Sequence, residues 1–131
     1  MTLAIVIGAL LGVVFAGLVR LVDRRRQVPL YAAGLVVAAA IYVVFALPAA
    51  GRGWLLVELG GLLLFTALAV AGRRRPALIA LGWLLHVAWD GLLHQPTHAP
   101  FVPVAYPALC IGFDLVVAVA AYLAARRSDP H

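Results

Sequence analysis

Residues 77–94 read ALIALGWLLHVAWDGLLH, an apolar stretch whose polar side chains are His86, Asp90 and His94. About 20 mostly apolar residues are enough for an α-helix to cross the hydrocarbon core of a bilayer. A charged side chain at the centre of a bilayer costs about 2.5–3.5 kcal/mol on insertion scales, so such residues are rare and usually functional. The stretch therefore predicts a membrane-spanning helix that carries part of a functional site.

The three polar residues of this helix recur at every fourth position. Since an α-helix turns by about 100° per residue, successive members are offset by about 40° and form one stripe about 12 Å long. The residues around them, from Trp83 to Leu93, are otherwise apolar or glycine. A narrow polar face of this kind must point into a helix bundle or into a wet cavity.

Four more apolar stretches of similar length accompany this helix. They cover residues 3–22, 30–47, 54–71 and 104–125. The chain of 131 residues is 66% hydrophobic and 11% charged, with a mean hydropathy of +1.08, whereas soluble domains are nearer half apolar and a quarter charged. We therefore predict an all-α integral membrane protein, a single domain of residues 1–131 with five transmembrane helices.

Arginines mark the ends of these helices. The chain has no lysine, and its net charge is +5. If the N-terminus lies outside, only Arg52 of the ten arginines lies outside with it, in accord with the positive-inside rule. The cytoplasmic arginines are then Arg20, Arg24, Arg25, Arg26, Arg73, Arg74, Arg75, Arg126 and Arg127. Because each cluster follows an apolar run, we interpret them as topology signals in a bacterial cytoplasmic membrane and expect lipid, not nucleic acid, as the partner.

Prolines and glycines agree with these helix boundaries. Pro29 and Pro76 are expected in the first turns of their helices, where a missing amide hydrogen costs nothing, and Pro48 is expected to end the second helix. The first helix carries Gly8-x-x-x-Gly12, a small-residue face that lets another helix approach closely. We expect this face to pack within the bundle; the alternative is a homo-oligomer formed through it.

The topology brings two more acids to the level of the polar stripe. Glu58 lies one turn below the outer end of the helix at 54–71, and Asp114 lies about 15 Å below the outer start of the helix at 104–125. All five ionisable residues therefore fall in the outer half of the bundle. We predict an outward-facing pocket there, with His98 of the outer loop folding over its mouth.

The residue types in this cluster suit a transition metal. Imidazoles and carboxylates are ordinary ligands of such ions, and a cation offsets the cost of burying anions. The ligands of a divalent ion such as Zn²⁺, Fe²⁺ or Mn²⁺ would be His86, Asp90, His94 and Glu58. Asp114 would instead orient a ligand imidazole. The leading hypothesis is thus a metal-binding membrane protein, in which the ion activates water or polarises a small apolar or lipid-like substrate.

Two other functions stay open for the same residues. Without a metal, a protonated Glu58, Asp90 or Asp114 could act as general acid with His86 as the base. That arrangement would suit an isomerase-like membrane enzyme or a ligand-binding protein. The other alternative is a subunit of a proton or metal-ion transporter, although transport calls for polar groups in both leaflets.

A purely structural role is the plainest interpretation of these side chains. His86 and Asp90 would form a hydrogen-bonded pair that fixes the register of the bundle. Asp114 would pair with a tyrosine such as Tyr42 or Tyr106. This interpretation accounts for one pair at a time, and it becomes less probable when all five residues have to be explained together.

A longer motif surrounds the polar stripe. Residues 82–90, GWLLHVAWD, followed by His94, resemble a G-W-L-L-H-x-x-W-D motif that ends in a histidine pair. The motif is that of a family of small bacterial multi-span integral membrane proteins of unknown function. A Trp–Glu element at Glu58 and an acid of the last helix at Asp114 are also similar. The chain departs from the pattern at Leu93, where the first histidine of the pair would lie, so the resemblance implies one metal ligand fewer and no particular activity.

Overall fold

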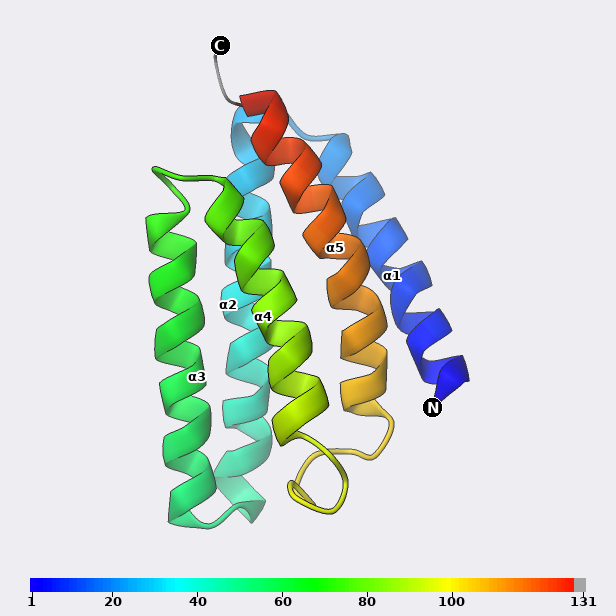
Figure 1. The fold of residues 1–131 in the computed structure, drawn as a ribbon, viewed down its shortest axis with the longest axis vertical. Helices are drawn as coiled ribbons and strands as arrows, with labels where there is room; N and C mark the ends of the chain where they lie inside the picture. The colour runs from blue at the N-terminus through cyan, green and yellow to red at the C-terminus, as the bar shows by residue number, and fades with distance from the viewer. Residues whose placement is uncertain (129–131) are drawn as a thin grey trace.

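The chain folds into five helices, and each helix runs antiparallel to the one before it (Figure 1). The computed structural model describes residues 1–128, and this range contains no β-strand. The helices are α1 (Thr2–Arg20), α2 (Arg24–Ala49), α3 (Arg52–Ala71), α4 (Ala77–Leu93) and α5 (Tyr106–Ser128). The predicted all-α class with five helices is confirmed, while residues 129–131 of the predicted domain lie outside the described residues.

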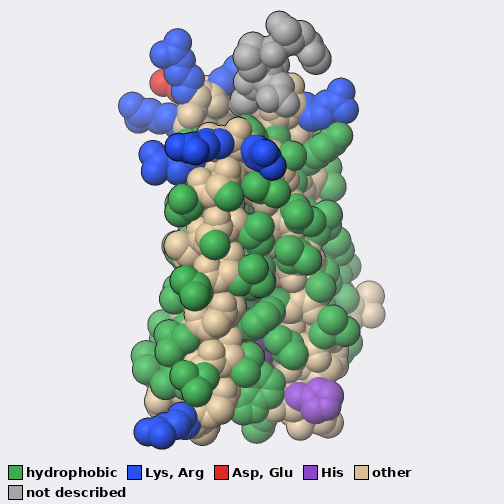
Figure 2. Space-filling view, turned by 60° about the vertical axis from the view of Figure 1, so that its left-hand side comes forward, with side chains coloured by type: hydrophobic (Ala, Val, Ile, Leu, Met, Phe, Trp, Pro, Cys, Tyr) green, Lys and Arg blue, Asp and Glu red, His purple; other side chains and the backbone are tan. Residues whose placement is uncertain are grey.

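The outside of the bundle is apolar along most of its length. Figure 2 shows a broad band of hydrophobic side chains, with basic residues gathered at one end and a smaller basic patch at the other. We call the first the arginine end; there α1, α3 and α5 finish, and α2 and α4 begin. Helices α1, α2, α3 and α5 are long and apolar enough to cross a membrane, and α4 has 17 residues. An apolar exterior of this extent is that of a membrane protein.

Helix α2 is longer than predicted. It extends the predicted range, residues 30–47, by six residues at its start and two at its end. Pro29 therefore lies in the second turn instead of the first, and Pro48 lies inside the last turn instead of ending the helix. The early start has a local cause, because the Gln27 side chain donates a hydrogen bond to the Val22 carbonyl at 3.1 Å and ties the first turn to the preceding chain. The other helix ends lie within three residues of their predicted positions.

Helices α1 and α5 touch through their backbones. A Cβ atom added at Gly8 would meet the Leu109 carbonyl, and one added at Gly112 would meet the Ile5 carbonyl. Such close approach requires glycine, as in other small-residue helix contacts. The face that carries Gly8 and Gly12 is therefore occupied within the chain. The sequence analysis did not single out Gly112, the counterpart from α5.

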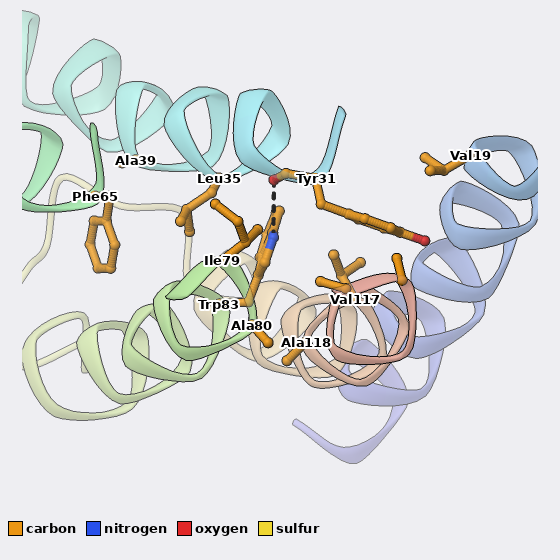
Figure 3. Packing of buried hydrophobic residues seen from close by; sticks show 12 residues of the cluster. Val19, Tyr31, Leu35, Ala39, Phe65, Ile79, Ala80, Trp83, Val117 and Ala118 are labelled. Atoms are coloured by element: carbon orange, nitrogen blue, oxygen red, sulfur yellow. Dashed lines mark hydrogen bonds between the residues drawn. The ribbon is translucent and has the colours of Figure 1, made fainter. Parts of the chain in front are cut away.

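An apolar core fills the half of the bundle next to the arginine end. Its buried members include Val19, Leu35, Phe65, Ile79, Val117 and Ala121. Figure 3 shows this packing around Trp83, whose indole Nε1 donates a hydrogen bond to the Tyr31 carbonyl at 3.1 Å. Because apolar side chains fill this half of the bundle, the buried ionisable residues lie in the opposite half.

Candidate functional site

Five ionisable side chains meet inside the bundle, in the half away from the arginine end. They are Glu58, His86, Asp90, His94 and Asp114, and each is at most 1% exposed. The residues from α4 and its C-cap follow one another at every fourth position, as their spacing predicts, while α3 supplies Glu58 and α5 supplies Asp114. The structure thus brings together all the ionisable residues that the sequence singled out in these helices.

His86 forms the inner part of the cluster with Asp114. Its Nδ1 donates a hydrogen bond to Oδ2 of Asp114 at 2.7 Å. The same Nδ1 lies 3.5 Å from Oδ2 of Asp90, which is too far for a good hydrogen bond. Phe65 packs edge-on against the imidazole, with ring centroids 4.9 Å apart. The hydrogen bond and the aromatic contact together fix the orientation of this ring.

His94 forms the outer part of the cluster with Glu58. Its Nε2 donates a hydrogen bond to Oε1 of Glu58 at 2.8 Å. On a neutral imidazole this leaves a lone pair at Nδ1, and that atom lies 3.6 Å from Oδ1 of Asp90. The second oxygen of Glu58 lies 3.5 Å from the indole Nε1 of Trp89, a ring for which Gly61 leaves room. Each carboxylate oxygen of Glu58 therefore faces a nitrogen from α4 or its C-cap, one from His94 and one from Trp89.

Tyr42 of α2 closes the cluster from a further helix. Its ring stacks on the imidazole of His94, with centroids 3.8 Å apart and planes within 9° of each other. Its hydroxyl is buried without a hydrogen bond and faces the carboxylate of Asp90. The sequence analysis had considered Tyr42 only as a partner of Asp114. Its depth in the bundle could be counted from the end of its helix, but its rotation toward His94 depends on how α2 and α4 pack.

Several buried polar atoms of this cluster have no hydrogen-bond partner. They are the Tyr42 hydroxyl, Nε2 of His86, Nδ1 of His94 and both carboxylate oxygens of Asp90. A buried polar group left unpaired costs about 1–3 kcal/mol, and a charged group costs more. Among them, Nδ1 of His94 and Oδ1 of Asp90 lie 3.6 Å apart, so one bound cation could contact both.

Three of these side chains can offer ligand atoms to one metal ion. One atom each from His86, Asp90 and Asp114 lie within 4.8 Å of one another. The separations of 3.5 and 3.6 Å around Asp90 are close to those between ligands of one ion. Nδ1 of His86 would first have to lose the proton that it donates to Asp114 at 2.7 Å, because only a nitrogen with a free lone pair can bind a metal. Glu58 and His94, which the sequence analysis also gave as ligands, lie outside this group and are joined to each other by a 2.8 Å hydrogen bond. The sequence analysis gave Glu58 as ligand and Asp114 as the orienting residue, whereas the group of convergent ligand atoms contains Asp114 and not Glu58.

The loop between α4 and α5 covers the outer end of the cluster. Ala99 and Val102 of this loop are buried and form an apolar cluster with Tyr42. His98, which we predicted over the mouth of an outward-facing pocket, lies in this loop and is exposed. The buried loop residues and the near-zero exposure of the cluster mean that the site is closed on this side, in place of the predicted open pocket.

The fold and the site define the class of protein: an apolar five-helix bundle that encloses an acid–imidazole cluster. The chain matches the model of a family of unknown function, DUF6010, over residues 3–127, and it belongs to that family. The matched range includes every residue of the cluster. No match was found among curated proteins or among solved structures.

Proposed function

We propose that this protein is an integral membrane protein of a bacterial cytoplasmic membrane that binds a divalent transition-metal ion inside its bundle. Zn²⁺, Fe²⁺ and Mn²⁺ suit its imidazole and carboxylate groups. One observation carries the proposal: the Asp90 carboxylate is fully buried and neither of its oxygens is hydrogen-bonded. Imidazole nitrogens of His86 and His94 lie 3.5 and 3.6 Å from those oxygens. A cation beside Asp90 would balance its charge and use the unpaired atoms around it.

The neighbours of Asp90 divide into ligands and a residue that orients a ligand. His86 and Asp114 complete the group of convergent ligand atoms, and His94 offers the lone pair of Nδ1 as a further ligand. Glu58 accepts the hydrogen bond from the far nitrogen of His94. A carboxylate in that place fixes the tautomer and direction of a metal-binding imidazole. An ion held here would supply Lewis acidity to a molecule that reaches the site.

Elemental analysis of protein purified in detergent tests the proposal. We expect about one divalent ion per chain, retained through dialysis, and loss of the ion in His86→Ala. His98→Ala is the matched control, because this histidine is exposed in the loop between α4 and α5. Metal that stays in His86→Ala, or that is lost equally in His98→Ala, would contradict the proposal.

The orienting role of Glu58 predicts a partial effect. Glu58→Gln keeps an oxygen that can accept the hydrogen bond from His94 but removes the charge. We expect the metal affinity to fall by about 10–100-fold, as is usual when the outer partner of a ligand imidazole is changed. Competition with a chromogenic chelator measures it. A loss as complete as in His86→Ala would instead make Glu58 a ligand itself.

The charge of the cluster predicts how metal binding depends on pH. The carboxylates of Glu58, Asp90 and Asp114 are buried with two imidazoles, so the site needs three positive charges to be neutral. Without metal, three added protons can supply them; with a divalent ion, one proton is enough. Binding should therefore release two protons, and the affinity should rise by up to about 100-fold per pH unit on the acidic side. Chelator competition across pH and a pH indicator in weak buffer measure this, and an affinity that does not change with pH would argue against it.

The order of contacts favours one second candidate, proton transfer without a metal. Acids and imidazoles alternate from Glu58 through His94, Asp90 and His86 to Asp114, and the hydrogen bonds at the two ends measure 2.8 and 2.7 Å. Such a chain could serve as the acid–base pair of a membrane enzyme. Metal-free protein whose ligand binding changes with Glu58→Gln and Asp114→Asn would support it. Transport through a single chain gains no support, because the described core beside the arginine end is apolar.

A further inference from the structure

A cavity of about 300 Å³ lies on the side of the bundle, between α1 and α2. Helix α1 packs mainly on α5 and makes few contacts with α2. Figure 1 shows α1 and α2 diverging from the short turn that joins them. Among the lining residues, Leu11 of α1 and Val37 of α2 are exposed on the outside of the bundle. The cavity therefore opens sideways, where a bilayer would place its acyl chains.

One residue of the acid–imidazole cluster, Asp114, lines the inner wall of this cavity. Tyr106, Cys110 and Asp114 line it at every fourth position of α5, and most of the remaining lining residues are apolar. Asp114 is almost fully buried and accepts a hydrogen bond from His86 through Oδ2. A carboxylate can accept several hydrogen bonds, so Asp114 can accept another from a molecule in the cavity. The cavity thus connects the lipid side of the bundle with the site.

We propose that this cavity admits a long-chain alcohol from the membrane, hydroxyl first, so that the hydroxyl donates a hydrogen bond to Asp114. The apolar walls suit a hydrocarbon chain. The outer loop covers the site toward water, whereas the side opening faces lipid. A hydroxyl can donate a hydrogen bond to a carboxylate, whereas an ionised fatty acid has no hydrogen to donate and would lose its hydration in the apolar cavity.

The size of the cavity favours a single chain over a phospholipid. A volume of about 300 Å³ is at the lower end for a small-molecule site. It takes a hydroxyl and the first carbons of one chain, and the rest of the chain would lie along Leu11 and Val37 in the lipid. The inference rests on the proposed function only through Asp114, and metal-free protein should still take up the alcohol.

Fluorescence quenching of Trp83 tests the proposal, because this indole lines the cavity. The chain has three tryptophans, so Trp54→Phe with Trp89→Phe leaves Trp83 alone. The protein is reconstituted in phosphatidylcholine nanodiscs, in metal-free and Zn²⁺-loaded form. The probes are dodecanol brominated at its fourth and fifth carbons, the matching bromododecanoic acid at alkaline pH, and the matching bromododecane. We expect saturable quenching by the alcohol at a membrane concentration about tenfold lower than by the acid, because the ionised acid has no donor for Asp114 and a high cost of desolvation.

Variants of α2 show whether the quencher enters through this cavity. A Cβ atom at Gly34 would lie 3.2 Å from the Trp83 ring and 3.4 Å from the Phe15 ring, so Gly34→Leu fills the space between them. Val37→Phe narrows the opening without adding bulk to the core. Val44→Phe is the matched control, since Val44 is 61% exposed against 59% for Val37, lies two turns along the same face, and does not line the cavity. Circular dichroism confirms that each variant keeps its helices.

The outcomes separate this inference from the metal site. Saturable quenching by the alcohol that is lost in Gly34→Leu or Val37→Phe, and kept in Val44→Phe, supports the cavity as the route. Equal quenching by the acid, or quenching that rises linearly for all three probes, overturns it. If Gly34→Leu fails to fold, Val37→Phe decides the question. A protein that binds metal but shows no selective quenching refutes this inference alone, and the reverse result refutes the metal site alone.

Discussion

Asp90→Asn is expected to abolish metal binding while leaving the metal-free protein at least as stable as the parent. The side chain that the proposed ion needs most is also one that forms no hydrogen bond in the bundle. Removing the partner of a metal ligand already lowers affinity by about 10–100-fold, so loss of a charged ligand should exceed about 100-fold. Stability should not fall, because the amide removes one of three buried carboxylates and breaks no hydrogen bond.

Asp114→Asn is the matched comparison for this prediction. Asp114 accepts a 2.7 Å hydrogen bond from His86, and an amide replaces that charged acceptor with a neutral one. Hydrogen bonds to charged groups are about twice as strong as neutral ones, so the metal-free protein should lose about 1 kcal/mol. The two substitutions change the same chemical group but should shift stability in different directions.

Chelator competition measures the affinity, and far-UV circular dichroism during heating measures the stability, both in the same detergent. Metal-free Asp90→Asn that unfolds well below the parent would show that the Asp90 carboxylate is paired in the folded protein. Near-normal affinity in this variant would move the metal site away from Asp90. Either result would contradict the proposed function, which rests on an unpaired Asp90 carboxylate as a metal ligand.

Gly8→Ala and Gly112→Ala are expected to destabilise the bundle strongly. A methyl group at either position would meet a backbone carbonyl of the other helix, and a backbone cannot move aside as the end of a side chain can. Overpacking of a well-packed contact costs about 1–3 kcal/mol, and we expect these variants at or above the top of that range. Because Gly112 is two residues from Asp114, α5 would also shift at the site.

Gly17→Ala provides the control on the same helix. A Cβ atom there would meet nothing within 4 Å, and alanine is the better helix former by about 1 kcal/mol. Its stability should therefore stay equal or rise slightly. Unfolding by heat and by a denaturing detergent checks the series. Equal stability of Gly8→Ala and Gly17→Ala would mean that α1 and α5 do not touch through their backbones.

Much of the fold follows from local features of the chain. Apolar length predicts each helix, because every backbone group inside a bilayer must be satisfied within its own segment. The spacing of His86, Asp90 and His94 predicts a buried polar stripe, because the period of a helix is a property of the backbone. The start of α2 is the main boundary that was wrong, and its cause is a side-chain contact of Gln27 outside the apolar run.

The depth of each acid could also be predicted, since rise per residue and the order of helices place Glu58 and Asp114 at the level of the stripe. Which imidazole each acid contacts could not be predicted from the sequence. The pairing of Asp114 with His86 and of Glu58 with His94 depends on how far α3 and α5 are rotated about their axes. That rotation is set by contacts elsewhere, such as the glycine contacts between α1 and α5.

The sequence by itself thus determines that this protein is a bundle of apolar helices with acids and imidazoles in one half, because hydrophobic length, helical period and arginine placement act within single segments. Only the tertiary structure decides which acid meets which imidazole, that Tyr42 stacks on His94, and that the outer loop closes the top while a cavity opens sideways. These features arise between segments, where the packing of side chains selects one rotation and one separation for each pair of helices.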